Sequence, residues 1–175
     1  MVKSYRTPCD NLQPATNKLQ RMHTRRIIQV LVWMFLAGPC ASAQVEVAFF
    51  LSPTCMICRF YALEMRDLTS DYSSRGVEFK GYAVGPLLND SLIEAFRTEY
   101  KIPFPIVRDD AMHRRLNASI TPEVFVIHND SVMYHGRIDD SFVRVGKRRT
   151  HLKNRELRNA LDCILQGKKP DIDYV

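Results

Sequence analysis

Cys55 and Cys58 are separated by two residues, in a setting that favours redox chemistry. An apolar run at 45–51 precedes them and an amphipathic helical pattern follows them. A CxxC pair between a strand and a helix is typical of a dithiol that alternates with a disulfide. A closed zinc site needs four ligands, and the sequence contains no second CxxC or HxxxH pair. We therefore predict thiol-disulfide chemistry.

The two sulfurs are expected to have different roles. At the start of a helix, Cys55 would face unpaired backbone N–H groups and the positive end of the helix dipole, which lower a thiol pKa below its free value of about 8.5. We predict that Cys55 is the nucleophile. Cys58 follows almost one helical turn later, so it could attack the mixed disulfide and release the partner.

The first 43 residues resemble an export leader. Arg25-Arg26 precede an apolar run at 27–36 that is too short for a bilayer core of about 30 Å, and Ala41-Ser42-Ala43 fits a signal-peptidase site. We predict a leader at 1–43, in which residues 22–43 are a secretory signal peptide. The true start of the chain is either Met1 or Met22. The mature chain would be periplasmic, without a stable membrane span. Lipid anchoring through Cys40 is the alternative.

Charge gives no reason to expect nucleic-acid binding. The chain has 25 basic and 19 acidic residues, but 1–43 contain six of the basic and one of the acidic residues, which leaves a net charge of +1 for the remainder. The cluster Lys147-Arg148-Arg149 is interpreted as a solvated loop. Residues 44–175 are enough for one domain with one core.

Periodicity predicts mixed helices and strands after Cys58. One helix ends near Gly76, a strand covers 77–84, and a capping box at Ser91 starts a second helix. A short strand at 106–107, a short helix at 109–116 and a hairpin of 122–127 with 132–138 follow. The last helix buries five apolar residues and leaves Cys163 partly exposed; the five are Leu157, Ala160, Leu161, Ile164 and Leu165.

Several motifs together resemble the bacterial redoxin group of the thioredoxin-like superfamily, labelled alkyl hydroperoxide reductase/thiol-specific antioxidant. They lie at 50–58, 104–109, 121–126, 136–140, 146–150 and 157–165. The resemblance covers about residues 45 to 170. It implies an α/β thioredoxin-like fold, with a central mixed sheet flanked by helices and a redoxin-type insertion before a cis-proline hairpin.

The resemblance also implies a cis bond between Thr121 and Pro122, close to the disulfide. The expected site is therefore Cys55, Cys58, Thr121 and Pro122, with the Thr121 backbone pairing with an extended substrate strand. We predict an exported thiol-disulfide oxidoreductase that acts on protein dithiols and disulfides without a cofactor. Its substrate, its electron donor, the direction of electron flow and its oligomeric state cannot be read from the sequence.

A thiol peroxidase is the first alternative, because the family label suggests one. Peroxiredoxins carry a proline and a hydroxyl residue before the reactive cysteine, and here Ala48 replaces the proline while Ser52 supplies the hydroxyl. The expected arginine aligns with Tyr134, and Arg137 is the nearby substitute.

A copper metallochaperone is the second alternative. Cys55 and Cys58 would bind the metal with a third ligand from His113, His128 or His135. The general base that would assist Cys58 is unassigned, with Glu64 and Lys80 as candidates.

Overall fold

A computed structural model describes residues 44–171, except 87 and 145. The predicted leader at 1–43, the alternative start at Met22 and the anchoring cysteine Cys40 lie outside the described residues. Within the described ranges, no helix has the length and apolar character that crossing a membrane requires.

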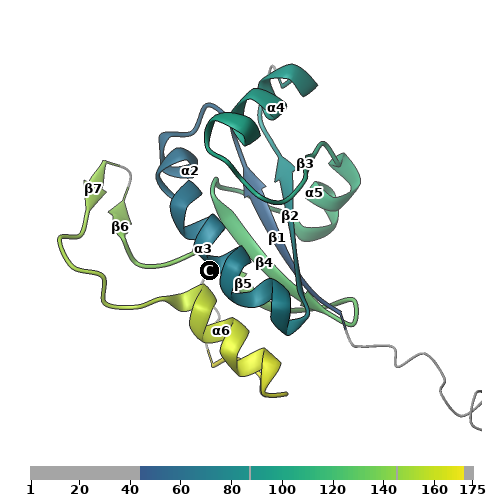
Figure 1. Ribbon diagram of the computed structural model, residues 1–175, viewed down its shortest axis with the longest axis vertical. Helices are drawn as coiled ribbons and strands as arrows, with labels where there is room; N and C mark the ends of the chain where they lie inside the picture. The colour runs from purple at the N-terminus through teal and green to yellow at the C-terminus, as the bar shows by residue number, and fades with distance from the viewer. Residues whose placement is uncertain (1–43, 87, 145, 172–175) are drawn as a thin grey trace, which may run out of the picture. The chain divides into compact units, whose positions relative to one another are not determined.

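A five-stranded mixed sheet forms the centre of the fold (Figure 1). Its strands are β1 (Val45–Leu51), β2 (Val77–Ala83), β3 (Ile106–Val107), β4 (Glu123–His128) and β5 (Ser131–Gly136). Their order is β3-β2-β1-β4-β5, with β1, β2 and β3 parallel and with β4 antiparallel to both β1 and β5. β1 is apolar at all positions but one, as a central strand covered on both faces requires.

Helices cover both faces of this sheet. They are α2 (Met56–Phe60), α3 (Ala62–Tyr72), the 3-10 turn η1 (Ser73–Arg75), α4 (Asp90–Glu99), α5 (Asp110–Leu116) and α6 (Glu156–Leu165). Side chains of α2, α3, α4 and α6 pack with Val47, Phe49 and Leu51 in one core cluster. On the other face, Phe50 and its neighbours pack with Leu116 of α5. The turn that joins β1 to α2 therefore follows Phe50 and Leu51, which are buried in the two core clusters on opposite faces of the sheet.

The predicted fold class is confirmed: a central mixed sheet flanked by helices in a thioredoxin-like arrangement. α4, β3 and α5 form the insertion between β2 and β4. The hairpin turn of β4 and β5 is made by Asn129 and Asp130, both in the left-handed region at φ 49° and 61°. Asn and Asp tolerate this backbone conformation, which the turns of tight hairpins require.

Three local predictions were inaccurate. The helix after Cys58 is interrupted at Tyr61, which separates α2 from α3. The next helix is capped by Asn89 rather than Ser91, because the Asn89 side chain accepts the Leu92 N–H at 2.8 Å. An additional hairpin, β6 (Phe142–Arg144) with β7 (Lys147–Arg148), lies apart from the main sheet in Figure 1.

Candidate active site

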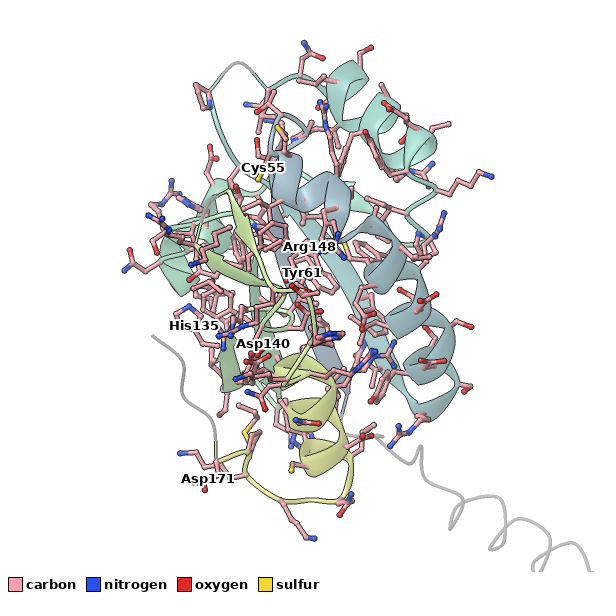
Figure 2. The ribbon with its side chains drawn as sticks, turned by 90° about the vertical axis from the view of Figure 1, so that its left-hand side faces the viewer. Cys55, Tyr61, His135, Asp140, Arg148 and Asp171 are labelled. Atoms are coloured by element: carbon pink, nitrogen blue, oxygen red, sulfur yellow. The ribbon has the colours of Figure 1, made fainter. Side chains whose placement is uncertain are left out.

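Cys55 occupies the N-cap position of α2, as the sequence predicts. Its backbone is extended, with φ −79° and ψ 117°, and its N–H donates to the Ser52 carbonyl at 3.0 Å. Arg59 holds the preceding turn from within the helix, since Nε and Nη2 donate to the Pro53 carbonyl at 3.1 and 3.0 Å. These bonds hold the half-exposed sulfur of Cys55 at the N-terminal end of α2 (Figure 2).

The environment of Cys55 favours its thiolate. Burial alone raises the pKa of a thiol, but hydrogen bonds to the sulfur from the Cys58 N–H, the Thr121 hydroxyl, the Cys58 thiol and the Ile57 N–H outweigh it. The pKa of Cys55 is therefore lowered. Backbone N–H groups at a helix start supply two of these four bonds, as expected for a nucleophilic cysteine.

Cys58 has the opposite environment. Its side chain is fully buried, and burial raises its pKa to about 12 despite the Ser52 N–H that donates to its sulfur at 3.5 Å. The negative charge of Cys55 raises the pKa further. One thiol of the pair is thus half-exposed with a lowered pKa, while the other is enclosed and protonated at neutral pH.

Thr121 and Pro122 lie beside this pair. The bond between them is cis, which confirms that prediction. The Cys55 thiol contacts the Thr121 carbonyl at 3.4 Å across 66 residues of sequence. The structure therefore brings Cys55, Cys58 and Thr121 together, with Pro122 as the next residue.

Sequence reasoning missed Glu123, a buried carboxylate under the loop that carries Thr121. Its Oε2 accepts the Ser119 N–H at 2.7 Å and the Ile120 N–H at 3.3 Å, and its Oε1 lies 2.6 Å from Nε2 of His135. A glutamate directly after Pro122 in a strand of apolar residues was the available indication. His135, considered above as a copper ligand, instead pairs with this carboxylate.

Arg137, the candidate peroxidase arginine, is held by a buried carboxylate. Its Nε and Nη2 donate to Oε1 of Glu156 at 3.0 and 2.6 Å, and Glu156 is fully buried on α6. Tyr134 donates to the Arg137 carbonyl at 2.6 Å. The Arg137 guanidinium therefore forms an ion pair that links the segment directly after β5 to α6.

The histidines do not assemble with the cysteines. In the described part of the chain, no group of three or more His, Cys, Asp or Glu residues could hold a metal ion. His113 lies near the ring of Phe50, with centroids 6.0 Å apart, and His128 ends β4. No observation favours the copper alternative.

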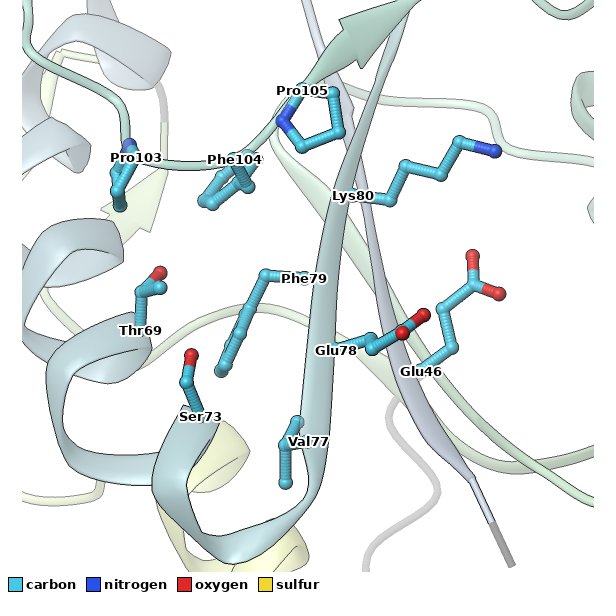
Figure 3. Close-up of a pocket in the computed structure, with 10 residues that line it drawn as sticks. All are labelled: Glu46, Thr69, Ser73, Val77, Glu78, Phe79, Lys80, Pro103, Phe104 and Pro105. Atoms are coloured by element: carbon cyan, nitrogen blue, oxygen red, sulfur yellow. The ribbon is translucent and has the colours of Figure 1, made fainter.

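A pocket of about 550 Å³ lies at the edge of β2 (Figure 3). Phe79 and Phe104 form its apolar part, with Pro103 and Pro105 beside them, and Glu78 stands on the strand edge. Neither cysteine of the CxxC pair lines it. This pocket is therefore separate from the candidate redox site.

Comparisons with known proteins identify the fold. No family model and no curated protein matches the chain. Two solved structures align with a TM-score of 0.65: an uncharacterized conserved protein from Geobacillus kaustophilus, 24% identical over 75% of this chain and 72% of that chain, and a hypothetical protein from Sinorhizobium meliloti 1021, 22% identical over 76% and 75%. A secreted Mycobacterium tuberculosis disulfide oxidoreductase, described as homologous to E. coli DsbE, aligns more weakly, with a TM-score of 0.44 and 22% identity over 53% of this chain and 69% of that chain. At these identities the likeness concerns the fold alone, and the narrower redoxin resemblance stays a prediction.

Proposed function

We propose that the protein is a thiol-disulfide oxidoreductase that uses Cys55 and Cys58 as its redox couple. The observation that carries this proposal is the opposite pKa shift of the two thiols. A thiolate is the attacking species in thiol-disulfide exchange, so a half-exposed thiol with a lowered pKa suits the first step. A buried thiol that stays protonated suits the second step, because it does not compete for the substrate.

In the reducing direction, the Cys55 thiolate attacks one sulfur of the substrate disulfide. The substrate S–S bond breaks, a Cys55–substrate disulfide forms, and the released thiolate takes a proton. Cys58 then loses its proton and attacks the Cys55 sulfur, which forms the Cys55–Cys58 disulfide and releases the reduced substrate. The oxidising direction is the reverse of these steps.

Formation of the mixed disulfide itself assists Cys58. The negative charge on Cys55 is one of the causes that raise the pKa of Cys58, and that charge disappears when Cys55 enters the mixed disulfide. Cys58 thus becomes easier to deprotonate when it is needed. Glu64 and Lys80 gain no support as its base, since Glu64 pairs with Arg158 at 2.7 Å and the Lys80 ammonium lies 5.1 Å from the centre of the Tyr82 ring.

The surroundings of Cys55 suit a polypeptide substrate. Met56 and Ile120, the neighbours of Cys55 and Thr121, are 80% and 63% exposed. Apolar side chains exposed beside a reactive thiol can contact the apolar residues of a docked segment. The Thr121 backbone, next to the sulfur, is in position to pair with such a segment.

The proposal includes export. The pattern of 22–43 supports a secretory signal peptide, with a mature chain from residue 44 in the periplasm and lipid attachment at Cys40 as the alternative. Mass measurement of the protein recovered from the exported fraction tests this: a chain that starts at 44 supports cleavage, and a chain that retains residues 22–43 contradicts it.

Peroxidase activity has less support. A peroxidatic thiolate needs a hydroxyl and a guanidinium around the peroxide. The Ser52 hydroxyl lies 3.1 Å from that of Thr54, and Arg137 is bound to Glu156. The structure therefore offers no specific observation that favours this alternative.

Trapping tests the assignment of the two thiols. We expect that Cys58→Ser accumulates a mixed disulfide with a cystine peptide through Cys55, and that Cys55→Ser accumulates none. Cys163→Ser is the matched control, since it removes the third described free cysteine and should behave like the wild type. A mixed disulfide formed through Cys58 or Cys163 in the wild-type chain would contradict the proposal.

A further inference from the structure

Residues 141–155, which we call the basic strap, contain six basic residues and no acidic one. The six are Arg144, Lys147, Arg148, Arg149, Lys153 and Arg155. The chain from residue 44 onward has a net charge of only +1, so this charge is concentrated locally. Such a concentration produces a positive field over one part of the surface.

The strap is anchored by a buried carboxylate. Oδ1 of Asp140 accepts the N–H groups of Lys153 and Asn154 at 2.9 and 3.1 Å, while Oδ2 lies 3.3 Å from Nε of Arg149. Asp140 directly precedes the strap and binds Lys153 and Asn154 near its far end, so the two ends of the strap are held together. The charge of Arg149 is thereby balanced.

The strap packs against the redox helix. The ring of Phe142 meets that of Phe60 edge-on at 5.0 Å, and the Arg148 guanidinium lies 4.4 Å from the centre of the same ring. Phe60 ends α2, so it is about 8 Å along the helix from Cys55 at about 1.5 Å per residue. Figure 2 shows Cys55 and Arg148 on this side of the molecule. Arg148 thus contacts the redox helix, and it forms β7 with Lys147, which corrects the interpretation of 147–149 as a loop; both residues are exposed, as predicted.

The tip of the strap carries two cations without a carboxylate partner. Arg144 and Lys147 are directly opposite each other in the β6–β7 hairpin and are exposed, and in the described part of the chain neither forms an ion pair. Like charges at opposed positions of a hairpin destabilise it. Their presence is therefore better explained by an interaction than by stability.

The nearest active-site segments do not offset this charge. Residues 47–63 contain no carboxylate and include the exposed Arg59, and residues 118–122 contain no charged residue. Beside the strap lies a groove of about 410 Å³, lined by the carboxylates of Glu64, Asp67 and Asp139 together with Arg148, Arg149 and Arg155 of the strap. The cations of this groove thus have carboxylates beside them, whereas Arg144 and Lys147 do not line it, so an anionic partner would contact the hairpin tip.

We propose that the hairpin tip formed by Arg144 and Lys147 is a docking surface for an acidic segment of the protein that exchanges disulfides at Cys55. This inference rests on the proposed function. A polypeptide is favoured over nucleic acid because Val143, beside Arg144, is an exposed apolar side chain, and Met56 and Ile120 are exposed apolar side chains beside Cys55 and Thr121. Arg148, the chain neighbour of Lys147, lies 4.4 Å from the centre of the Phe60 ring on α2, so the tip adjoins the redox helix and its charge acts on an approaching substrate.

The test compares two cystine peptides of equal length, one with acidic and one with basic flanks, on the full chain. We expect a second-order exchange rate about 10-fold higher for the acidic peptide at 10 mM ionic strength, and a difference below about twofold at 0.5 M. R144Q/K147Q should reduce this selectivity ratio about 5- to 10-fold. K168Q/K169Q, which removes the same charge after α6, should retain the wild-type ratio.

Equal ratios for the wild type and R144Q/K147Q would overturn the docking surface. Binding of an acidic peptide without cysteine, measured by fluorescence anisotropy, separates the two proposals. If neither cystine peptide exchanges, the proposed function fails; if the wild type and R144Q/K147Q bind the cysteine-free peptide equally, the docking surface fails. A single-stranded DNA of equal charge that binds more tightly than the acidic peptide would overturn the choice of a protein partner.

Discussion

Selective alkylation of Cys55 is the prediction that follows most directly from the geometry of the site. The pKa of Cys58 is raised to about 12, whereas that of Cys55 is lowered from the ordinary value of 9.0, so the two differ by at least about three units. At neutral pH the thiolate fraction of Cys55 is then at least about 1000 times that of Cys58. A less basic thiolate is also a weaker nucleophile, with a Brønsted coefficient of about 0.4 to 0.5. This reduces the rate advantage of Cys55 by a factor of about 16 to 32.

The net prediction is that Cys55 reacts at least about 30 to 60 times faster than Cys58, before the restricted access of the reagent to Cys58 is considered. The assay is a short pulse of iodoacetamide on the reduced protein at pH 6.5, followed by peptide mass spectrometry. Cys55 should become labelled at lower pH than an ordinary thiol because its pKa is lowered. Labelling of Cys58 at a comparable rate, or first, in the folded protein would refute the assignment of nucleophile and resolving thiol.

Three further predictions concern the Arg137–Glu156 ion pair and the packing of Gly81. Arg137→Met should cost about 3 to 5 kcal/mol in urea unfolding because it leaves the buried Glu156 carboxylate unpaired, and Arg137→Met/Glu156→Leu should recover most of that loss; a single variant as stable as the wild type would show that the pair is unimportant. The same Arg137 variant should change the peroxide oxidation rate of Cys55 by less than twofold, and a large decrease would restore the peroxidase alternative. Gly81→Ala should cost about 1 to 3 kcal/mol in the same unfolding assay, since its Cβ would lie 2.8 Å from Cγ1 of Ile106, and an unchanged midpoint would contradict this close packing.

Local patterns of the sequence predicted most of the fold. The spacing of Tyr61, Met65, Leu68 and Tyr72 predicts one helical face, and all four side chains are buried. The break at Tyr61 does not alter that face, so periodicity alone could not reveal it. The basic strap was missed for a different reason: its strands have two and three residues, too few to show an alternating pattern.

The site residues that lie close together in the sequence could be predicted from their spacing, and those that meet over long sequence distances could not. Cys55 and Cys58 were found from their spacing, whereas the position of Thr121 required the resemblance to a fold, since it meets Cys55 across 66 residues. The pair of Glu123 and His135 depends on the register of β4 and β5, which the sequence does not contain explicitly. Long-range polar partners of this kind could be identified only from the structure.

The short length of β3 has a consequence for solubility. β3 pairs only with Gly81 and Tyr82 of β2, so the first part of that strand, at 77–80, has an edge without a paired strand in the described structure. An open edge can template pairing with another molecule, and natural proteins discourage this with charge and proline. Here Glu78 and Lys80 lie on the strand, and prolines stand at 103 and 105 across the pocket of Figure 3. The pocket is thus bordered by charged residues and prolines, the two features that discourage pairing at an open sheet edge.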